Sequence, residues 1–173
     1  MLGNVGIVYY RFTLMFCSLA DPQLLKTELF VHGQWLSGQT TFEVISPING
    51  QLIAQVSHAD ASITQRAIES AQQAFNQWRK TPAQTRSNLL QAWAKLMLQH
   101  KQDLALIIHA EQGKPLAEAG AEVERSAEYV SYYAAEAMRI RGEVVNTVAH
   151  DQRGVCSQQG MGVVAAITPW NFP

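Results

Sequence analysis

The stretch that decides the fold class is Met161-Gly162-Val163-Val164-Ala165-Ala166-Ile167-Thr168-Pro169-Trp170-Asn171-Phe172-Pro173. Its first seven residues are apolar without alternation, which is typical of a strand buried on both faces of a parallel sheet. Such a strand needs a parallel partner, reached through a crossover of about a dozen residues or more. No second run of this kind occurs in the 173 residues. The sequence therefore predicts an α/β fold that is incomplete within this chain.

The segment after the predicted strand carries the most specific chemistry. It follows the C-terminal end of the strand, where α/β folds bind their ligands. Prolines fix its backbone, Trp170 offers an apolar wall, and the Asn171 amide offers two uncharged N–H donors. A neutral donor held rigidly is what an oxyanion site requires. The residues alone leave a second interpretation equally open, in which Asn171 only makes a turn in a proline-stiffened loop.

The first third of the chain has the pattern of short antiparallel strands. In order, the expected elements are a hairpin over residues 29–35 with Gly33 in its turn, a strand over 42–45, a turn over 46–50, and a strand over 52–56. The Asn49-Gly50 pair tolerates positive φ and so favours the turn. In the last strand, Leu52, Ala54 and Val56 share one face.

Apolar residues at three- and four-residue spacing predict three amphipathic helices, over about residues 62–78, 82–112 and 115–141. Capping boxes are expected at Ser62 and at Thr81, with Gly113 and Gly142 ending the second and third helices. The apolar stripe of the first helix is Ile63, Ala67, Ala71, Ala74, Phe75 and Trp78. The expected buried face of the second is Leu89, Trp93, Leu96, Met97, Leu104, Ile107 and Ile108.

The third helix has a charge order that suits the helix dipole. Its acidic residues near the N-terminus are Glu118, Glu122 and Glu124, and its basic residues near the C-terminus are Arg139 and Arg141. Its aromatic cluster, Tyr129, Tyr132 and Tyr133, is interpreted as packing rather than as a binding site.

Two further strands are predicted at about residues 143–148 and 155–159, separated by a polar turn. Cys156 falls in the second strand, with no base or helix N-terminus nearby to lower the pKa of its thiol, so it is interpreted as structural. The glycines at 160 and 162 precede the apolar strand, whereas phosphate-binding glycines follow one. They are interpreted as a bend at the entry to the sheet.

Composition excludes several classes of protein. With 13 Lys and Arg against 14 Asp and Glu, the net charge of −1 gives no basic excess for nucleic-acid binding, and 47% hydrophobic residues exclude disorder. The two cysteines make no disulfide framework, and the five scattered histidines predict no metal site. Arg11 interrupts the apolar start, so no membrane span is predicted, and a cytoplasmic location is expected. Met15 is the alternative start.

Two segments resemble a known family. Residues 162–173, with Pro169-Trp170-Asn171-Phe172-Pro173, resemble the strand and loop that open the cofactor domain of the aldehyde dehydrogenase superfamily. Glu111-Gln112-Gly113-Lys114-Pro115-Leu116-Ala117-Glu118-Ala119 resembles a helix-turn-helix segment of its bacterial succinate-semialdehyde dehydrogenase branch. The resemblance covers about residues 30–173. At position 160, this chain has Gly where similar sequences usually have Pro.

The resemblance implies an N-terminal fragment of that fold, made of short β-hairpins, three amphipathic helices, part of an oligomerisation arm and the first buried strand of the cofactor sheet. The implied division is an extension over 1–27, strands and helices of the cofactor-binding domain over 28–142, part of the arm over 143–160, and the truncated strand and loop over 161–173. The full-length form is then expected to be a homo-oligomer.

The family oxidises an aldehyde to an acid with NAD or NADP. A cysteine thiolate attacks the carbonyl, an asparagine amide holds the oxyanion, and a glutamate activates the hydrolytic water. The resemblance implies a small aldehyde substrate, for example succinate semialdehyde, and assigns the oxyanion donor to Asn171. It also implies that the nicotinamide end of the cofactor is lined by Ile167, Thr168, Pro169, Trp170 and Asn171.

The family's nucleophile, general base, cofactor-binding lysine and glycine-rich segment all follow this region, so none matches a residue of this chain. Cys156 does not occupy the nucleophile position. The 173-residue chain alone is therefore expected to be inactive. The competing hypothesis is a non-enzymatic remnant or helical interaction module that associates with an intact homologue.

Overall fold

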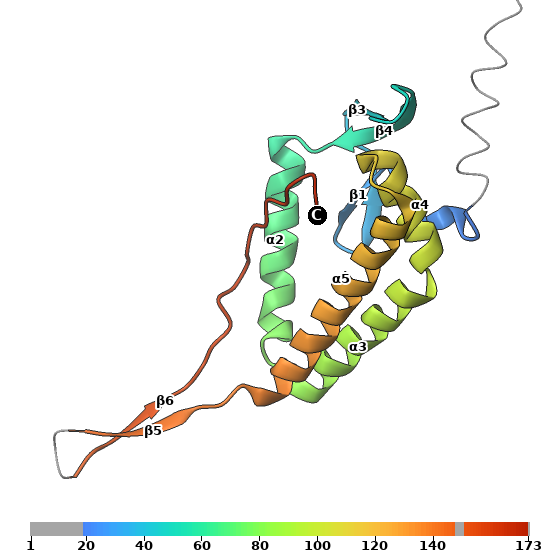
Figure 1. Cartoon of the computed structure of the whole chain (residues 1–173). Helices are drawn as coiled ribbons and strands as arrows, with labels where there is room; N and C mark the ends of the chain where they lie inside the picture. Colours follow the sequence, from blue (N-terminus) through green and yellow to red (C-terminus); the bar gives the residue numbers. More distant parts are fainter. Residues whose placement is uncertain (1–18, 148–150, 173) are drawn as a thin grey trace, which may run out of the picture.

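The computed structural model describes residues 19–147 and 151–172. Two short hairpins precede a group of helices, and a third hairpin projects from the end of the helical part (Figure 1). In chain order, the elements are η1 (Pro22–Leu24), β1 (Leu29–Val31), β2 (Gln34–Leu36), β3 (Thr40–Ile45), β4 (Leu52–His58), α2 (Ala61–Trp78), α3 (Ala83–Gln99), α4 (Lys101–Gln112), α5 (Leu116–Glu136), η2 (Ala137–Arg139), β5 (Glu143–Asn146) and β6 (Arg153–Cys156). The apolar start with Arg11 and the alternative start Met15 lie outside the described residues, as does the second cysteine, Cys17.

The two predicted strand pairs of the first third are confirmed. β1 pairs antiparallel with β2, and His32 and Gly33 between them have φ of 54° and 75°, as a two-residue hairpin turn requires. β3 pairs antiparallel with β4 across the turn that contains Gly50, whose φ is 67°. In β4, the buried residues are Ile53 and Ser57, on the face opposite to Leu52, Ala54 and Val56.

The first predicted helix is confirmed as α2, but its predicted cap is wrong. The side chain that caps it is Asp60, whose Oδ1 accepts a hydrogen bond from the N–H of Ile63 at 2.8 Å. Asp60 has extended backbone angles and immediately precedes the first helical residue, which is the position that a capping side chain must occupy. Ser62 already lies inside the first turn.

The second predicted helix is two helices, α3 and α4, which meet at His100. The φ and ψ of His100, −99° and 18°, leave the helical region, although its N–H and C=O still bond to Leu96 and Leu104. The spacing of apolar residues continues through His100, so the sequence pattern could not reveal this break between the two helices. The predicted cap at Thr81 is also wrong, because Pro82 precedes the helix without a side-chain bond and the Thr81 hydroxyl donates to the carbonyl of Gln77.

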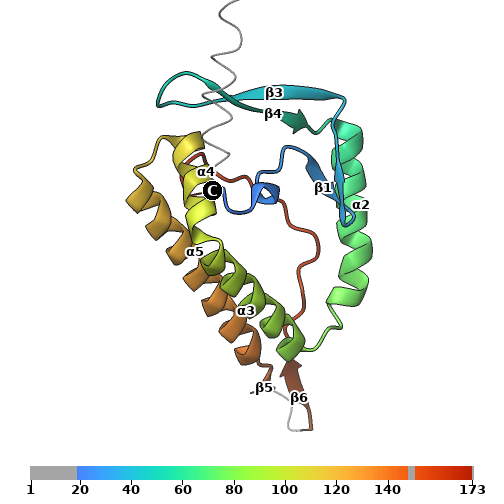
Figure 2. The same ribbon diagram turned by 90° about the vertical axis from the view of Figure 1, so that its right-hand side faces the viewer.

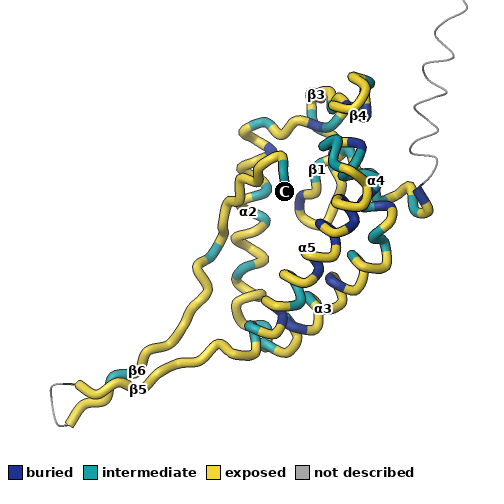
Figure 3. Tube along the Cα trace, viewed as in Figure 1, coloured by how far each residue is buried: buried dark blue, intermediate teal, exposed yellow. Residues whose placement is uncertain are grey.

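The helices pack through small side chains, which corrects the predicted buried face. α5 lies along α3 and α4, and burial is concentrated where these helices meet (Figures 2 and 3). The buried residues there include Ala94, Ala105, Ala110, Ala119, Val123, Ala127 and Ala134. Leu89, Trp93 and Leu96 are instead more than half exposed. Small side chains let helix backbones approach closely. The hydrophobic pattern instead led to the large apolar side chains being predicted as the buried ones.

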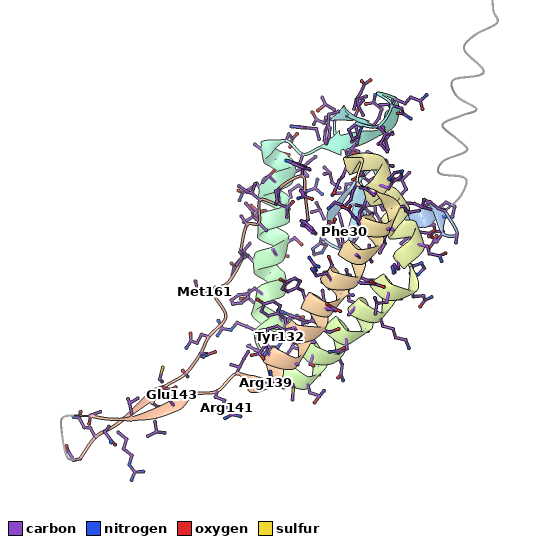
Figure 4. All side chains as sticks on the ribbon, viewed as in Figure 1. Phe30, Tyr132, Arg139, Arg141, Glu143 and Met161 are labelled. Atoms are coloured by element: carbon purple, nitrogen blue, oxygen red, sulfur yellow. The ribbon has the colours of Figure 1, made fainter. Side chains whose placement is uncertain are left out.

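The aromatic cluster of α5 is not packed into this core, contrary to its interpretation. Tyr129, Tyr132 and Tyr133 are each more than half exposed, and Tyr132 meets the Tyr133 ring edge-on with centroids 5.3 Å apart (Figure 4). α2 is also largely uncovered, since Ile63 is its one buried residue within the described chain. The third predicted helix itself is confirmed as α5, which ends in the short η2 before Gly142.

The two strands predicted after Gly142 are found as β5 and β6, which pair antiparallel. The predicted bounds of the second are wrong, because β6 covers Arg153–Cys156 and not 155–159. It extends away from the helices (Figure 1). Cys156, at the end of β6, is free and exposed, and its interpretation as a structural cysteine stays a prediction. Gly160 then lies against α2, where an added Cβ would stand 3.0 Å from Cε2 of Phe75.

The prediction of a buried strand over residues 161–167 is wrong for this structure. The segment has no strand pairing, and Met161 and Ile167 are 95% and 99% exposed. Every sheet among the described residues is a two-stranded antiparallel pair, so the parallel partner that such a strand needs is not among them. An apolar run alone does not form a strand. Within the described chain, no helix is both long and apolar enough to span a membrane.

The close helix contact predicts that Ala134→Leu destabilises the protein. Ala134 has no exposed surface, so a leucine there must displace its neighbours, at a cost of about 1–3 kcal/mol in the free energy of unfolding. The neighbouring Ala135 is exposed on the same helix, and Ala135→Leu is the matched control. Urea unfolding of both variants tests the packing, and equal effects would contradict it.

Asp103 attaches the segment before η1 to α4. Its two carboxylate oxygens accept hydrogen bonds from the N–H groups of Ala20 and Asp21, each at 2.9 Å. These bonds hold the pKa of Asp103 below its ordinary value, although burial opposes them. A lowered pKa means that the carboxylate stabilises the fold at neutral pH and that this stability is lost as the pH falls through the folded-state pKa.

Asp103→Asn is therefore expected to lower the thermal unfolding midpoint at pH 7, since one amide oxygen cannot replace both acceptors. The difference from wild type should shrink as the pH falls below the ordinary range of aspartate and through the lowered pKa of Asp103, because the wild-type carboxylate then also becomes protonated. Circular dichroism melts across this range measure it, with exposed Asp151→Asn as the control. A difference independent of pH would show that the charge of Asp103 is not involved.

Candidate functional site at the α4–α5 junction

The turn between α4 and α5 is fixed on both sides. Gly113 ends α4 with φ of 74°, and its N–H bonds to the carbonyl of His109. Pro115 precedes the first residue of α5. The Nδ1–H of His109 donates to the carbonyl of Lys114 at 2.6 Å. The positive φ favours glycine at 113, and an added Cβ would also stand 3.1 Å from Cγ of Pro47. The backbone of Lys114 is therefore held in one place.

The Lys114 side chain joins this turn to the C-terminal segment. Its Nζ forms an ion pair with Glu122 of α5 and donates a hydrogen bond of 2.8 Å to Oδ1 of Asn171. The same Nζ lies 4.0 Å from the centroid of the Phe172 ring, within the range of a cation–π interaction. One ammonium group thus contacts a carboxylate, an amide oxygen and an aromatic face.

The ion pair is withdrawn from water. The side chains of Lys114 and Glu122 keep 12% and 5% of their surface exposed. Removing two charges from water is costly, and the cost is offset when each meets the other together with further polar partners. Glu122 had been expected only as an acidic residue near the start of the helix. In the structure, it is the counter-charge of a buried lysine.

The predicted site residues separate into two groups. Asn171 reaches the α4–α5 junction and is partly buried there. Ile167, Thr168, Pro169 and Trp170 are exposed, with Trp170 at 79%. The shallow hollow lined by Arg125, Glu128, Tyr129 and Tyr132 is a separate feature on α5.

Lys114 and Glu122 were not among the functional residues predicted from the sequence. The signal was nevertheless present, because the Gly113-Lys114-Pro115 turn lies in one of the two segments that resemble the family. Spacing alone could not show that residue 114 meets residue 171 across 57 positions. Within the described residues, no cluster of three or more His, Cys, Asp or Glu side chains is placed to hold a metal ion.

The junction predicts unequal roles for two neighbouring ion pairs. Glu122→Gln leaves Lys114 buried without its counter-charge, so we expect a loss of about 3–5 kcal/mol in the free energy of unfolding. Glu124→Gln removes the partner of Lys101 in a pair that is 37% and 51% exposed, and we expect a loss of about 0–1 kcal/mol. Urea unfolding of the two variants compares them. Equal losses would contradict the buried character of the first pair.

Comparison with known proteins identifies relatives over the same region. The family model described as "Aldehyde dehydrogenase family" matches residues 35–173. Human mitochondrial succinate-semialdehyde dehydrogenase is 43% identical over 150 residues, which are 87% of this chain and 28% of the human protein. The 3-sulfolactaldehyde dehydrogenase of Pseudomonas putida is 41% identical over 157 residues, which are 90% of this chain and 32% of that protein.

Solved structures agree with these relatives. The succinate-semialdehyde dehydrogenase of Burkholderia pseudomallei superimposes with a TM-score of 0.88 at 40% identity, over 90% of this chain and 33% of that one. An indole-3-acetaldehyde dehydrogenase of P. syringae, solved with NAD+ and IAA, gives a TM-score of 0.84 at 32% identity, over 94% and 33%. The chain spans about a third of the length of the relatives it matches.

Proposed function

Because this chain belongs to the aldehyde dehydrogenase family, we propose that it supplies the N-terminal part of an NAD(P)-dependent enzyme that oxidises a small aldehyde to its acid. Succinate semialdehyde or a similar aldehyde is the proposed substrate, in keeping with the relatives named for succinate semialdehyde. The observation that carries the proposal is the Asn171 amide, which a buried lysine holds within the segment that matches the family.

Asn171 is the proposed oxyanion donor of this enzyme. When an aldehyde carbonyl is attacked, its oxygen gains negative charge, and a fixed neutral N–H donor stabilises that charge without a prior rearrangement. The hydrogen bond to Lys114 engages only Oδ1 of Asn171. The Nδ2 group of Asn171 is therefore the part that can donate to a substrate oxygen.

The nicotinamide cofactor is proposed to lie against Ile167, Thr168, Pro169 and Trp170, next to Asn171. The large exposed side chains of Ile167 and Trp170 fit an apolar ring, although they form only one side of such a site. When bound, the cofactor would accept hydride from the substrate. The part of these residues is to orient the ring and to exclude water from its face, and they do not distinguish NAD from NADP.

The nucleophile and the general base are proposed to come from outside these 173 residues. β6, which carries Cys156, lies away from the chain end marked C in both views (Figures 1 and 2). Cys156 is therefore not proposed as the nucleophile that acts beside Asn171. We infer that the 173-residue chain alone does not oxidise aldehydes, and that the projecting β5–β6 hairpin belongs to an oligomer contact of the whole enzyme. The cytoplasmic location stays a prediction.

A helical interaction module is the second candidate, favoured by the large apolar side chains exposed on α3 and α5. In this alternative, those faces bind an intact homologue without chemistry of their own. Light scattering of the chain mixed with human succinate-semialdehyde dehydrogenase, taken as the intact homologue, tests for such a complex. A stable complex favours this alternative.

A chimera tests the proposed enzyme directly. Residues 35–173 would replace the matching region of human succinate-semialdehyde dehydrogenase, and NADH formation would be followed with succinate semialdehyde. We expect an active chimera, and we expect Asn171→Ala to lower kcat by about 10²–10³-fold through loss of the oxyanion donor. Asn76→Ala, at an exposed position of α2, is the control.

Two outcomes would contradict this proposal. One is a folded chimera without activity, and the other is an Asn171→Ala variant as active as the control. The 173-residue chain by itself, assayed with NAD or NADP, should give no turnover above a blank without protein.

A further inference from the structure

We propose that Lys114, held by Glu122, is a positioning residue that orients the side-chain amide of Asn171. The inference rests on the proposed function, because the orientation matters only if Asn171 donates to a substrate oxygen. It goes further in naming the residues that decide which way the amide faces. It concerns contacts within the chain, so it can be tested without any turnover.

The orientation follows from what each group can do. A lysine ammonium has three N–H donors and no acceptor, so only the oxygen of an amide can face it. The contact of 2.8 Å between Nζ of Lys114 and Oδ1 of Asn171 therefore excludes the flipped amide, which would place two donors against each other. With Oδ1 fixed, the Nδ2 group must point away from Lys114. An isolated asparagine would have no such preference between its two ends.

The ion pair keeps Lys114 aimed at Asn171. Lysine has a long side chain with many rotamers, and an unpartnered lysine would turn toward water. Here Glu122 holds the ammonium from α5, and the Phe172 ring lies 4.0 Å from it. The two side chains of the ion pair are 12% and 5% exposed, so water competes poorly for the ammonium. Lys114 thus has a single position from which it meets Asn171.

The positive charge also strengthens the donor. A charged hydrogen bond to the amide oxygen draws electron density from the amide, and linked hydrogen bonds polarise one another in this way. The Nδ2–H groups of Asn171 then become better donors to an oxyanion. Glu122 balances the charge, so the site gains this polarisation without an unpaired buried cation.

The test compares two double variants of the 173-residue chain. Lys114→Met with Glu122→Gln removes both charges of the buried pair, which avoids leaving one of them unpaired in the interior. Lys101→Met with Glu124→Gln is the matched control, because it removes an exposed pair between α4 and α5 near the same junction. Both variants have the same net charge. Circular dichroism establishes that each is folded, and Lys114→Arg serves as the conservative variant that keeps a positively charged donor.

The readout is the side-chain amide of Asn171, observed by ¹⁵N–¹H NMR and assigned from its loss in Asn171→Asp. In wild type and in the control, we expect a rigid amide with a positive heteronuclear NOE and a chemical shift distinct from that of exposed Asn76. In the Lys114/Glu122 variant, we expect the NOE to collapse and the shift to move to that of Asn76. Lys114→Arg should retain part of the wild-type signal. An Asn171 signal that is the same in all folded variants overturns the inference.

The chimera separates this inference from the proposed function. There, the Lys114/Glu122 variant should lower kcat at least tenfold while the KM for aldehyde stays within about twofold. The aldehyde still binds, but the Asn171 amide no longer faces the oxyanion that forms from it. Unchanged kcat in an active chimera overturns the positioning role. If the chimera is inactive before any substitution, the proposed function fails, while the NMR result still decides whether Lys114 orients Asn171.

Discussion

The buried ion pair between Lys114 and Glu122 is the contact on which the arrangement of the candidate site depends. It joins the turn after α4 to the second turn of α5, and its ammonium reaches on to Asn171 and Phe172. The pair can form because Gly113 takes a left-handed φ and Pro115 starts a new helix, so that Lys114 projects from a fixed turn. The backbone conformation of the turn at Gly113 thus fixes the position of Lys114, which holds Asn171 from 57 positions away in the sequence.

The helical part shows why close packing and hydrophobicity are different constraints. α5 approaches α3 and α4 through alanines, with Ala119, Ala127 and Ala134 almost fully buried. The large apolar residues of α3, among them Trp93 and Leu96, remain exposed in this chain. Since the chain spans about a third of the length of its relatives, we propose that these outward faces are covered by the rest of the enzyme.

Most elements could be predicted from the sequence because their signals are local. The turn at Gly33, the helix stop at Gly113 and the helix α2 each depend on a few neighbouring residues, and each is confirmed. The strand over residues 161–167 depends on hydrogen-bonding partners that the apolar run cannot supply, so that prediction is wrong here. For the candidate site, Asn171 was found through its motif, whereas its partner Lys114 depends on tertiary contact and was missed.

The identity of that partner determines what Asn171 can do. A serine, glutamine or water next to the amide could either donate or accept, so each would tolerate both orientations of the asparagine. A lysine tolerates one, and the buried carboxylate of Glu122 keeps the lysine from turning away. An oxyanion site gains rate only from donors that already face the position where charge develops. In the enzyme that we propose, a residue that never touches the substrate therefore limits the reaction, because the amide would otherwise have to turn before it could donate.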